Sequence, residues 1–218
     1  MAIFRGTDGF EIFQGAAEPD DFQGLGGNDI IAGGTGNDRG NGGDGNDTVD
    51  GQDGNDTLFG GLGADLVVGG EGDDNVGGFP EEEGSVPLGA PDGDDMVFGD
   101  AGEDEIDGGG GNDTLYGGEG SDVFWFWPNE GTDFILDFQP GEDQIGLPGF
   151  TNLTTFTNLD TNSTGTLDDG DLDVTVGADG TLLIDFTSHG SATGLVVLGA
   201  GNSIQSQDVF FAATDYFT

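Results

Sequence analysis

The sequence predicts an all-β protein in which a right-handed parallel β-roll is followed by a small antiparallel β cap. Three observations predict this fold. A nine-residue repeat fills the first part of the chain, and glycine, which accounts for 47 of the 218 residues, recurs in the turn half of each repeat. After Trp125 glycine becomes rarer, and aromatic residues and strand-like segments replace it. We therefore expect the roll at residues 1–125 and the cap at residues 126–218.

The repeat has the form G-G-x-G-x-D-x-U-x, where U is a bulky apolar residue. A fixed period of this kind sets the architecture before any local propensity does. The aspartates at the sixth position are Asp29, Asp38, Asp47, Asp56, Asp65, Asp74, Asp95, Asp104, Asp113 and Asp122. The apolar residues at the eighth position are Ile31, Val49, Leu58, Val67, Val76, Val97, Ile106, Leu115 and Phe124.

Each repeat divides into a turn and a short strand. Glycine adopts positive φ without a Cβ clash, so the first six residues can form a tight turn. The last three residues form a strand with one side chain pointing inward. Such a short strand is stable only if successive turns stack and their backbones pair. Two repeats then make one coil, and the eighth-position side chains fill a thin core between two sheets.

The repeat phase has three irregularities. It extends back through two degenerate units, Gly6–Gln14 with Glu11 and Gly15–Gln23 with Asp20, so we expect about six coils and doubtful metal sites at the start. Gly40 occupies an inward position and should leave the core thin there. Residues 78–89 form an insertion, which we expect to bulge from a loop without breaking the stack; its role is a tolerated excursion or a partner-binding segment.

Stacked coils about 4.8 Å apart would place the aspartates of each flank in a ladder of like charges, which opposes folding. The ladders therefore need cations. Carboxylates and exposed loop carbonyls form an all-oxygen ligand set that suits Ca²⁺, and less well Mg²⁺, which demands stricter geometry. We expect several Ca²⁺ ions, about eight to eleven. A disordered acidic, glycine-rich chain is the alternative, and it describes the calcium-free state best.

The nonapeptide resembles the repeat of the RTX (repeat-in-toxin) calcium-binding β-roll proteins. About ten units match, over nearly half of the chain. The segment that follows, with Asp122, Phe124, Phe126, Gly131, Asp133, Ile135, Asp137, Phe138, Gly141, Asp143 and Ile145, resembles the region after the repeats in RTX proteins secreted by type I systems. The C-terminal residues DYFT are similar to the uncleaved secretion signal of such proteins. The resemblance implies calcium binding and a secreted, extracellular or cell-surface location.

The region after the repeats contains strand-like segments at residues 134–138, 172–176, 181–186, 195–198 and 209–211. Asp179-Gly180 predicts a hairpin turn between two of them. Trp125 and Trp127 alternate with Phe124 and Phe126, so one pair faces the core. The other pair is either covered by the cap or exposed as a contact or sugar-stacking patch.

Residues 160–171 match the calcium loop of an EF-hand. Six residues supply the expected ligand positions: Asp160, Asn162, Thr164, Thr166, Asp168 and Asp171. Asp171 replaces the usual bidentate glutamate and Thr164 is neutral, so we expect weakened affinity. The flanking residues favour strands over helices. A calcium site and a bare Asx-rich turn are both open for this segment.

Composition excludes several functional classes. With 44 acidic and two basic residues the formal net charge is −42, which argues against nucleic acid and anionic membranes as partners. There is no cysteine and one histidine, which excludes disulfides, thiol-bound metals and histidine-based zinc sites. No apolar run approaches the roughly 20 residues of a membrane span.

These features predict a secreted calcium-binding structural or assembly protein that folds on Ca²⁺ outside the cell. An uncapped first coil would allow head-to-tail self-association into filaments or a matrix. No nucleophile–base set is present and the acids follow the calcium period, so we do not expect an enzyme. The alternatives are an adhesion or polysaccharide-binding module and the secretion or folding module of a larger enzyme system.

Overall fold

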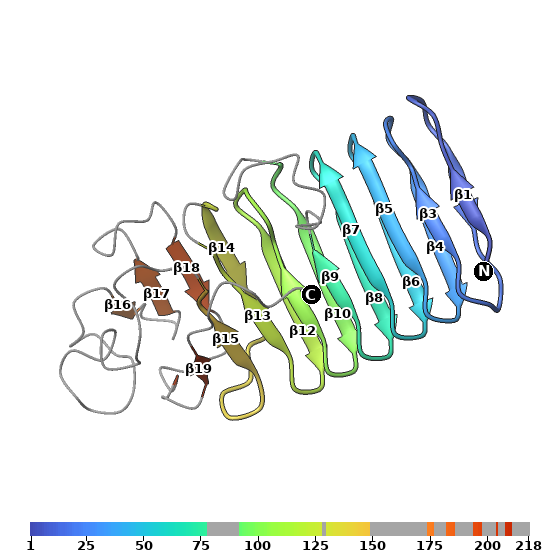
Figure 1. Cartoon of the computed structure of the whole chain (residues 1–218). Helices are drawn as coiled ribbons and strands as arrows, with labels where there is room; N and C mark the ends of the chain where they lie inside the picture. The colour runs from blue at the N-terminus through green and yellow to red at the C-terminus, as the bar shows by residue number, and fades with distance from the viewer. Residues whose placement is uncertain are drawn as a thin grey trace.

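The structure is a computed structural model of the whole chain. It describes residues 1–77, 92–127 and 130–148, four strands between residues 174 and 210, and the single residues Ile204 and Asp208. Figure 1 shows the described strands stacked along one axis, from β1 at one end to β16 at the other. Among these residues no helix has the length and apolarity of a membrane span.

Alternate strands along the chain belong to two sheets. The first sheet contains, in order, β1 (Ile3–Arg5), β3 (Asp21–Gln23), β5 (Arg39–Asp44), β7 (Thr57–Leu62), β9 (Asn75–Gly77), β11 (Glu105–Asp107), β13 (Val123–Trp125), β15 (Gln144–Gly146) and β19 (Val209–Phe210). The second contains β2 (Ile12–Gln14), β4 (Ile30–Thr35), β6 (Thr48–Asp53), β8 (Leu66–Glu71), β10 (Met96–Ala101), β12 (Thr114–Glu119), β14 (Thr132–Ile135), β18 (Gly194–Val197), β17 (Leu182–Asp185) and β16 (Val174–Val176).

Strand pairing is parallel throughout the repeats, which confirms the predicted parallel roll. In the regular repeats paired residues lie two units apart, as for Thr48 and Leu66. Pairing across residues 78–91 keeps this register: Leu66 pairs with Met96 and Asn75 with Glu105. Parallel pairing also continues beyond Trp125 through β14 and β15. The roll therefore has about seven turns, one more than the repeats alone predicted.

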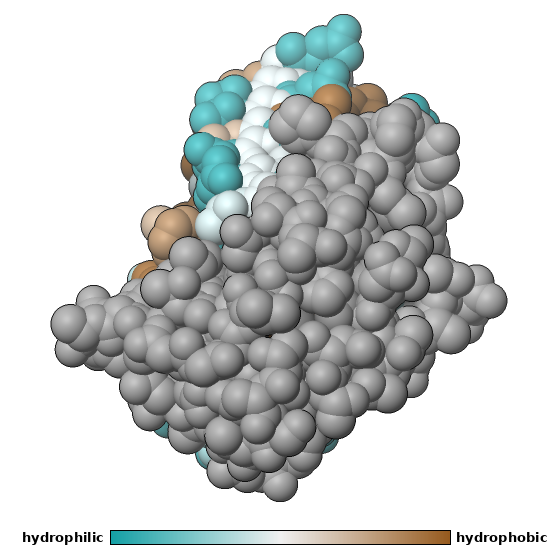
Figure 2. Space-filling view, turned by 90° about the vertical axis from the view of Figure 1, so that its left-hand side faces the viewer, coloured by the Kyte–Doolittle hydropathy of each residue, from teal (hydrophilic) through white to brown (hydrophobic). Residues whose placement is uncertain are grey.

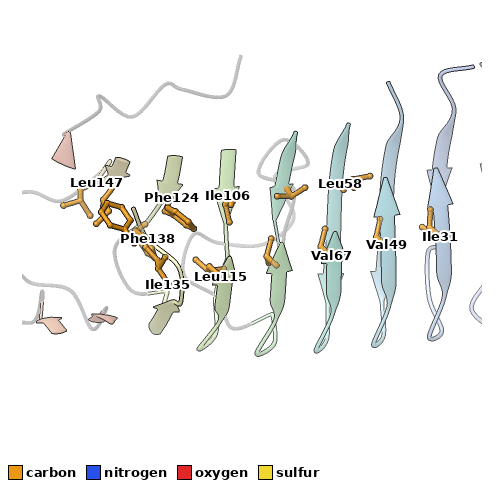
Figure 3. Close-up of a cluster of buried hydrophobic side chains, with 14 of the residues drawn as sticks. Ile31, Val49, Leu58, Val67, Ile106, Leu115, Phe124, Ile135, Phe138 and Leu147 are labelled. Carbon is orange, nitrogen blue, oxygen red and sulfur yellow. The ribbon is translucent and has the colours of Figure 1, made fainter. Parts of the chain in front are cut away.

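The eighth-position side chains form the core, as predicted. Nearly all of them are at most 1% exposed, and they alternate between the two sheets, with Val67 from β8 and Ile106 from β11 among them. Figure 3 shows these side chains pointing into the space between the two rows of strands. Each repeat contributes only one buried apolar side chain, so the core is a single column of apolar groups along the roll.

The two degenerate units at the start continue the roll, as expected, because β1, β2 and β3 pair in register with the repeats that follow. Phenylalanine occupies the core position in all three strands. The rings of Phe4 and Phe22 stack with centroids 4.7 Å apart, and Phe13 packs against both. Phe4 and Phe13 are only partly buried, so the core ends here in exposed aromatic surface.

Gly40 lies on the inward side of β5, as the repeat phase predicted. Its neighbours approach closely: a Cβ on Gly40 would lie 3.0 Å from Cγ1 of Val49 and 3.1 Å from Cδ2 of Leu58. The adjacent side chains therefore lean into the space that the missing side chain leaves. The core is thin at this position without being empty.

Both tryptophans are buried. Trp125 is 2% and Trp127 is 4% exposed, while Phe124 and Phe126 belong to the core cluster. The indole N–H of Trp127 donates a hydrogen bond of 3.1 Å to Asp107 Oδ2. Of the two alternatives left open by the sequence, burial therefore holds for both tryptophans, and an exposed contact or sugar-stacking patch is excluded.

The antiparallel cap predicted for residues 126–218 needs correction at its start. The segment expected at residues 134–138 is β14, which pairs parallel with β12 and belongs to the roll. Strands β16, β17 and β18 do pair antiparallel. Most of residues 149–218, including Asp179-Gly180 and the C-terminal DYFT, lie outside the described residues. A separate cap and the domain boundary at residue 125 stay predictions.

Burial predicts unequal effects for two neighbouring residues of β12. Replacing Leu115, which is 0% exposed, by alanine should lower the free energy of unfolding of the calcium-loaded protein by about 2–5 kcal/mol. Thr114→Ala is the matched control, since Thr114 is half-buried on the outer face, and it should change stability far less. Urea unfolding followed by circular dichroism measures both. Equal losses would contradict the single-column core.

Candidate metal centre

The aspartates of the repeats lie in the loops that join the two sheets, immediately before each strand. The loop backbone requires positive φ at the second and fourth positions of the repeat, as at Gly34 (110°) and Gly36 (132°). Glycine meets this requirement without a Cβ clash. Leu25, Gln52 and Asp100 occupy the second position with φ of 75–78°, so the turn geometry is kept even where glycine is replaced.

One carboxylate oxygen of each aspartate joins successive coils. The backbone N–H of Asp47 donates to Oδ1 of Asp65 at 2.7 Å, and the N–H of Asp56 donates to Oδ1 of Asp74 at 2.7 Å. The same bond repeats along both flanks, with distances from 2.6 to 3.2 Å. We call the two rows aspartate ladders. One contains Asp29, Asp47, Asp65, Asp95, Asp113 and Asp133; the other contains Asp20, Asp38, Asp56, Asp74, Asp104, Asp122 and Asp143.

The second carboxylate oxygen of ten ladder residues is buried and accepts no hydrogen bond. These Oδ2 atoms belong to Asp29, Asp38, Asp47, Asp56, Asp65, Asp74, Asp95, Asp104, Asp113 and Asp122. They are the ten repeat aspartates that the sequence predicted as metal ligands. A buried carboxylate oxygen without a partner is costly, and a bound cation is the usual compensation.

Backbone carbonyl oxygens lie near the same Oδ2 atoms. A Cβ on Gly33 would lie 2.6 Å from Oδ2 of Asp38 and 2.7 Å from the carbonyl oxygen of Gly51 in the next coil. The same pair of oxygens surrounds Gly69, where Oδ2 of Asp74 is 2.5 Å and the carbonyl oxygen of Gly99 is 2.8 Å from such a Cβ. Glycine at the first position of the repeat therefore leaves a small oxygen-lined cradle between coils.

The donor set fits a hard cation. Each cradle combines carboxylate and carbonyl oxygens without nitrogen or sulfur, which suits Ca²⁺. Within the described residues no group of three acidic or histidine side chains forms, so any ion in a ladder must complete its shell with backbone oxygens. The residues that would hold Ca²⁺ are thus the ladder aspartates and the glycine carbonyls of the next coil.

The ladders are electrostatically unfavourable without cations. Burial raises the pKa of Asp65 to about 7, with the charges of Asp47 and Asp92 adding to the effect. Burial likewise raises the pKa of Asp95 to about 8. At Asp113, burial and the neighbouring charge of Asp133 raise the pKa far above its ordinary range. Each shift means that the ionised form is disfavoured in the folded chain until a positive charge offsets it.

Besides Asp20, two aspartates of the ladders were not predicted as ligands. Asp133 accepts the N–H of Asp113 at 3.1 Å and Asp143 accepts that of Asp122 at 3.2 Å, and both are at most 2% exposed. They follow their partners by 20 and 21 residues instead of 18, which hides them from a strict nine-residue count. The signal is present in the G-x-D-x-I spacing of Gly131-Asp133-Ile135 and Gly141-Asp143-Ile145.

The acids of the degenerate units behave differently. Glu11 accepts hydrogen bonds from Thr7, from its N–H at 3.0 Å and its hydroxyl at 2.6 Å, and these bonds lower the pKa of Glu11. Asp20 accepts from the N–H of Ala2 at 2.6 Å and of Ala16 at 3.4 Å. Glu11 thus binds within its own loop, whereas Asp20 keeps the bond to the preceding coil through Oδ1 and binds its own loop through Oδ2.

The predicted EF-hand-like ligands lie outside the described residues. They are Asp160, Asn162, Thr164, Thr166, Asp168 and Asp171. The calcium site at residues 160–171 stays a prediction.

Comparison with known proteins agrees with the geometry. The RTX calcium-binding nonapeptide repeat (4 copies) matches residues 5–39, 41–76 and 92–124. The solution structure of the AlgE6R3 subunit from the Azotobacter vinelandii mannuronan C5-epimerase is 28% identical, with a TM-score of 0.51, covering 73% of this chain and 84% of that one. No curated protein sequence matches significantly.

A second similar structure is the extracellular lipase LipA from Serratia marcescens, at 18% identity and a TM-score of 0.37. The alignment covers 96% of this chain, which spans 40% of the lipase.

Neutralising one ladder aspartate tests the contribution of its charge while its hydrogen bond is kept. Asp65→Asn keeps an Oδ1 acceptor for the N–H of Asp47 but removes the charge beside the cradle. We expect the calcium concentration at half-folding to rise about tenfold or more, because affinity falls with the charge of the ligand set. Circular dichroism during calcium titration measures it. Asp53→Asn, at an exposed position at the end of β6 and outside the ladders, removes the same charge and should shift the midpoint little.

The raised pKa values predict that acid partly replaces calcium. Groups with folded-state pKa values of about 6 to 8 and unfolded values near 4 stabilise the fold when protonated and lose that contribution as the pH rises through 6 to 8. In chelator, lowering the pH from 8 to 5 should therefore increase β-structure in the far-UV spectrum. In calcium the same change should weaken ion binding. A calcium-free spectrum that stays constant over this range would contradict the shifts.

Proposed function

Because this chain belongs to the RTX calcium-binding nonapeptide repeat family, we propose that it is a secreted structural protein that folds on calcium outside the cell and then assembles head-to-tail. The observation that carries the proposal is the set of ten buried Oδ2 atoms without hydrogen-bond partners. They make the roll dependent on cations along most of its length. A protein built in this way stays unfolded where calcium is scarce and folds where it is abundant.

The net charge of −42 opposes folding of the chain when calcium is scarce. Without calcium the acids repel one another, and the core of one apolar side chain per repeat offers little to oppose them. An extended, soluble polyanion is a suitable substrate for export through a channel. Calcium at millimolar concentration outside the cell would then stabilise the roll by mass action. We expect about eight to eleven ions, most of them in the aspartate ladders.

Head-to-tail assembly is supported by the surface at the β1–β2 end of the roll. Ile3 is 70%, Phe10 is 61% and Ile12 is 66% exposed, and the rings of Phe4 and Phe13 in the same two strands are only partly buried. Strands β1 and β2 are also the edges of their sheets. An apolar end with two unpaired strand edges favours pairing with the opposite end of another copy, a contact that does not close.

We propose no enzymatic role for the roll. Its buried acids accept hydrogen bonds from backbone N–H groups of the preceding coil, and no catalytic domain is evident in the described residues. A second candidate role is that of a folding or secretion module in a larger enzyme system. It is favoured by the similarity to one repeat subunit of a mannuronan epimerase. Polysaccharide binding through the tryptophans is disfavoured, since both are buried.

Two isoleucines at the exposed end test the assembly. Calcium-loaded wild-type protein should form filaments in negative-stain electron microscopy, and EGTA should dissolve them. The double substitution Ile3→Thr and Ile12→Thr should abolish filaments while leaving the calcium-induced circular dichroism unchanged. Leu62→Thr, at a 36% exposed position at the end of β7 and away from the end of the roll, is the control and should leave filaments intact. Wild-type protein that stays dispersed in calcium at high concentration would overturn head-to-tail assembly.

A further inference from the structure

Asn41 and Gly42 form the one Asn-Gly sequence in the chain. Asn41 occupies the ninth position of its repeat, and Gly42 occupies the first position of the next. The first position requires glycine, because a Cβ on Gly42 would meet Oδ2 of Asp47 and lie 2.5 Å from the carbonyl oxygen of Gly60. The cradle therefore places a glycine directly after an asparagine, whose side-chain amide can react with the next backbone nitrogen.

Asparagine followed by glycine deamidates without an enzyme, because glycine has no side chain to obstruct the reaction. The backbone nitrogen of Gly42 loses its proton to a solvent base and attacks Cγ of Asn41. The new N–Cγ bond closes a five-membered succinimide, the Cγ–Nδ2 bond breaks, and the nitrogen takes a proton from water and leaves as ammonia. Water then opens the ring at either carbonyl, giving aspartate or isoaspartate. The reaction needs only water and a backbone that brings the two atoms together.

The folded roll holds this dipeptide in an extended strand with neighbours on both sides. Asn41 and Gly42 lie in β5, between β3 and β7 (Figure 1), and Gly42 is buried. Asn41 pairs with Gln23 of β3 and with Phe59 of β7, and its carbonyl oxygen accepts the N–H of Gly24 at 2.8 Å. Ring closure requires the peptide unit between Asn41 and Gly42 to rotate, and this rotation would break the pairing of β5.

We propose that Asn41 is a deamidation site that stacking of the coils suppresses, so that the chain modifies itself only while it is unfolded. The inference rests on the calcium-dependent folding of the proposed function and is independent of head-to-tail assembly. Because calcium stabilises the stacked coils, it sets the fraction of chains in which the dipeptide is free to react. The extent of modification therefore records how long the chains have spent without calcium.

The two products differ in what they do to β5. Isoaspartate routes the main chain through the former side chain and adds a carbon between residues 41 and 42. The strand beyond that point, where Gly43 pairs with Gly61, then loses its register. The core resists this little, because Gly40 leaves the inward position of β5 without a side chain. Aspartate keeps the register and adds one carboxylate to a chain of net charge −42, whose visible roll surface already carries hydrophilic residues (Figure 2).

The preceding coils supply a matched control. Gln14 and Gln23 occupy the ninth position of their repeats and are also followed by glycine, so the roll accommodates the longer amide there. Gln23 lies beside Asn41 in the same sheet. Glutamine has to close a six-membered ring, which forms far more slowly than the succinimide. Asn41→Gln therefore keeps the amide and removes the rapid reaction.

Incubation of the full chain in calcium, in chelator, and in urea with calcium tests the site, in a phosphate-free buffer at mildly alkaline pH. Circular dichroism reports folding in each sample, and mass spectrometry of the peptide that contains residue 41 measures aspartate and isoaspartate. Deamidation should be about tenfold or more faster in chelator and in urea than in calcium, because only the opened chain reacts. Asn41→Gln should stay unmodified at this position, and Asn55, which aspartate follows, is the internal reference.

The outcomes separate the site from the calcium dependence of the fold. Equal rates at Asn41 in calcium and in urea would overturn the protection, and a rate in urea no faster than that of Asn55 would overturn the reactivity. A chain that stays folded and reacts slowly in chelator, while it reacts rapidly in urea, would contradict calcium-dependent folding and uphold the protection by stacking.

Returning the aged, chelated chains to calcium tests the consequence for the roll. The β-sheet signal that wild-type protein regains should fall in step with its isoaspartate content, whereas Asn41→Gln aged in parallel should refold fully. Complete refolding of wild-type chains that are rich in isoaspartate would overturn the effect on stacking.

Discussion

The structure depends on the placement of carboxylates between stacked coils. From Asp38 onward, one oxygen of each ladder aspartate accepts the N–H of the aspartate one coil earlier, so the acid that carries the charge also fixes the stacking. The other oxygen is left buried at the cradle. Removing the charge of a ladder aspartate would therefore relieve repulsion, but it would also remove a cation ligand. Keeping the charge requires a bound cation. This coupling makes the fold of the repeats a calcium-dependent state.

The remaining contributions to stability are small or local. The core supplies one apolar side chain per repeat, and the loops are held in positive φ by glycine at little steric cost. Backbone hydrogen bonds between loops repeat along each flank, as from Gly36 to Asp53 and from Gly54 to Glu71. None of these interactions favours one coil over another. The roll is consequently uniform along its axis, and its special features lie at the ends and on the outer faces.

Much of this arrangement could be predicted because a fixed period converts positions in the sequence into positions in space. The repeat identified the buried residues, the ten aspartates with unpartnered oxygens and the inward position of Gly40. It missed two ligands beyond Phe124. Asp133 and Asp143 sit in the ladders although they follow their partners by 20 and 21 residues, since their Oδ1 atoms accept the same bond as in the regular repeats.

Burial of the aromatic residues could not be read from alternation alone. Alternation placed Trp125 and Trp127 on the face opposite Phe124 and Phe126. Whether other segments of the same polypeptide cover that face depends on residues far away in sequence.

Hydrogen exchange at the ladder amides tests the central claim most directly. The N–H groups of Asp47, Asp56 and Asp65 are bonded only if the coils are stacked. Mass spectrometry at neutral pH should find peptides across these residues strongly protected in calcium and exchanging at the rate of an unfolded chain after complete chelation. Equal protection in both conditions would show that the coils stack without cations, and it would contradict the dependence of the fold on calcium.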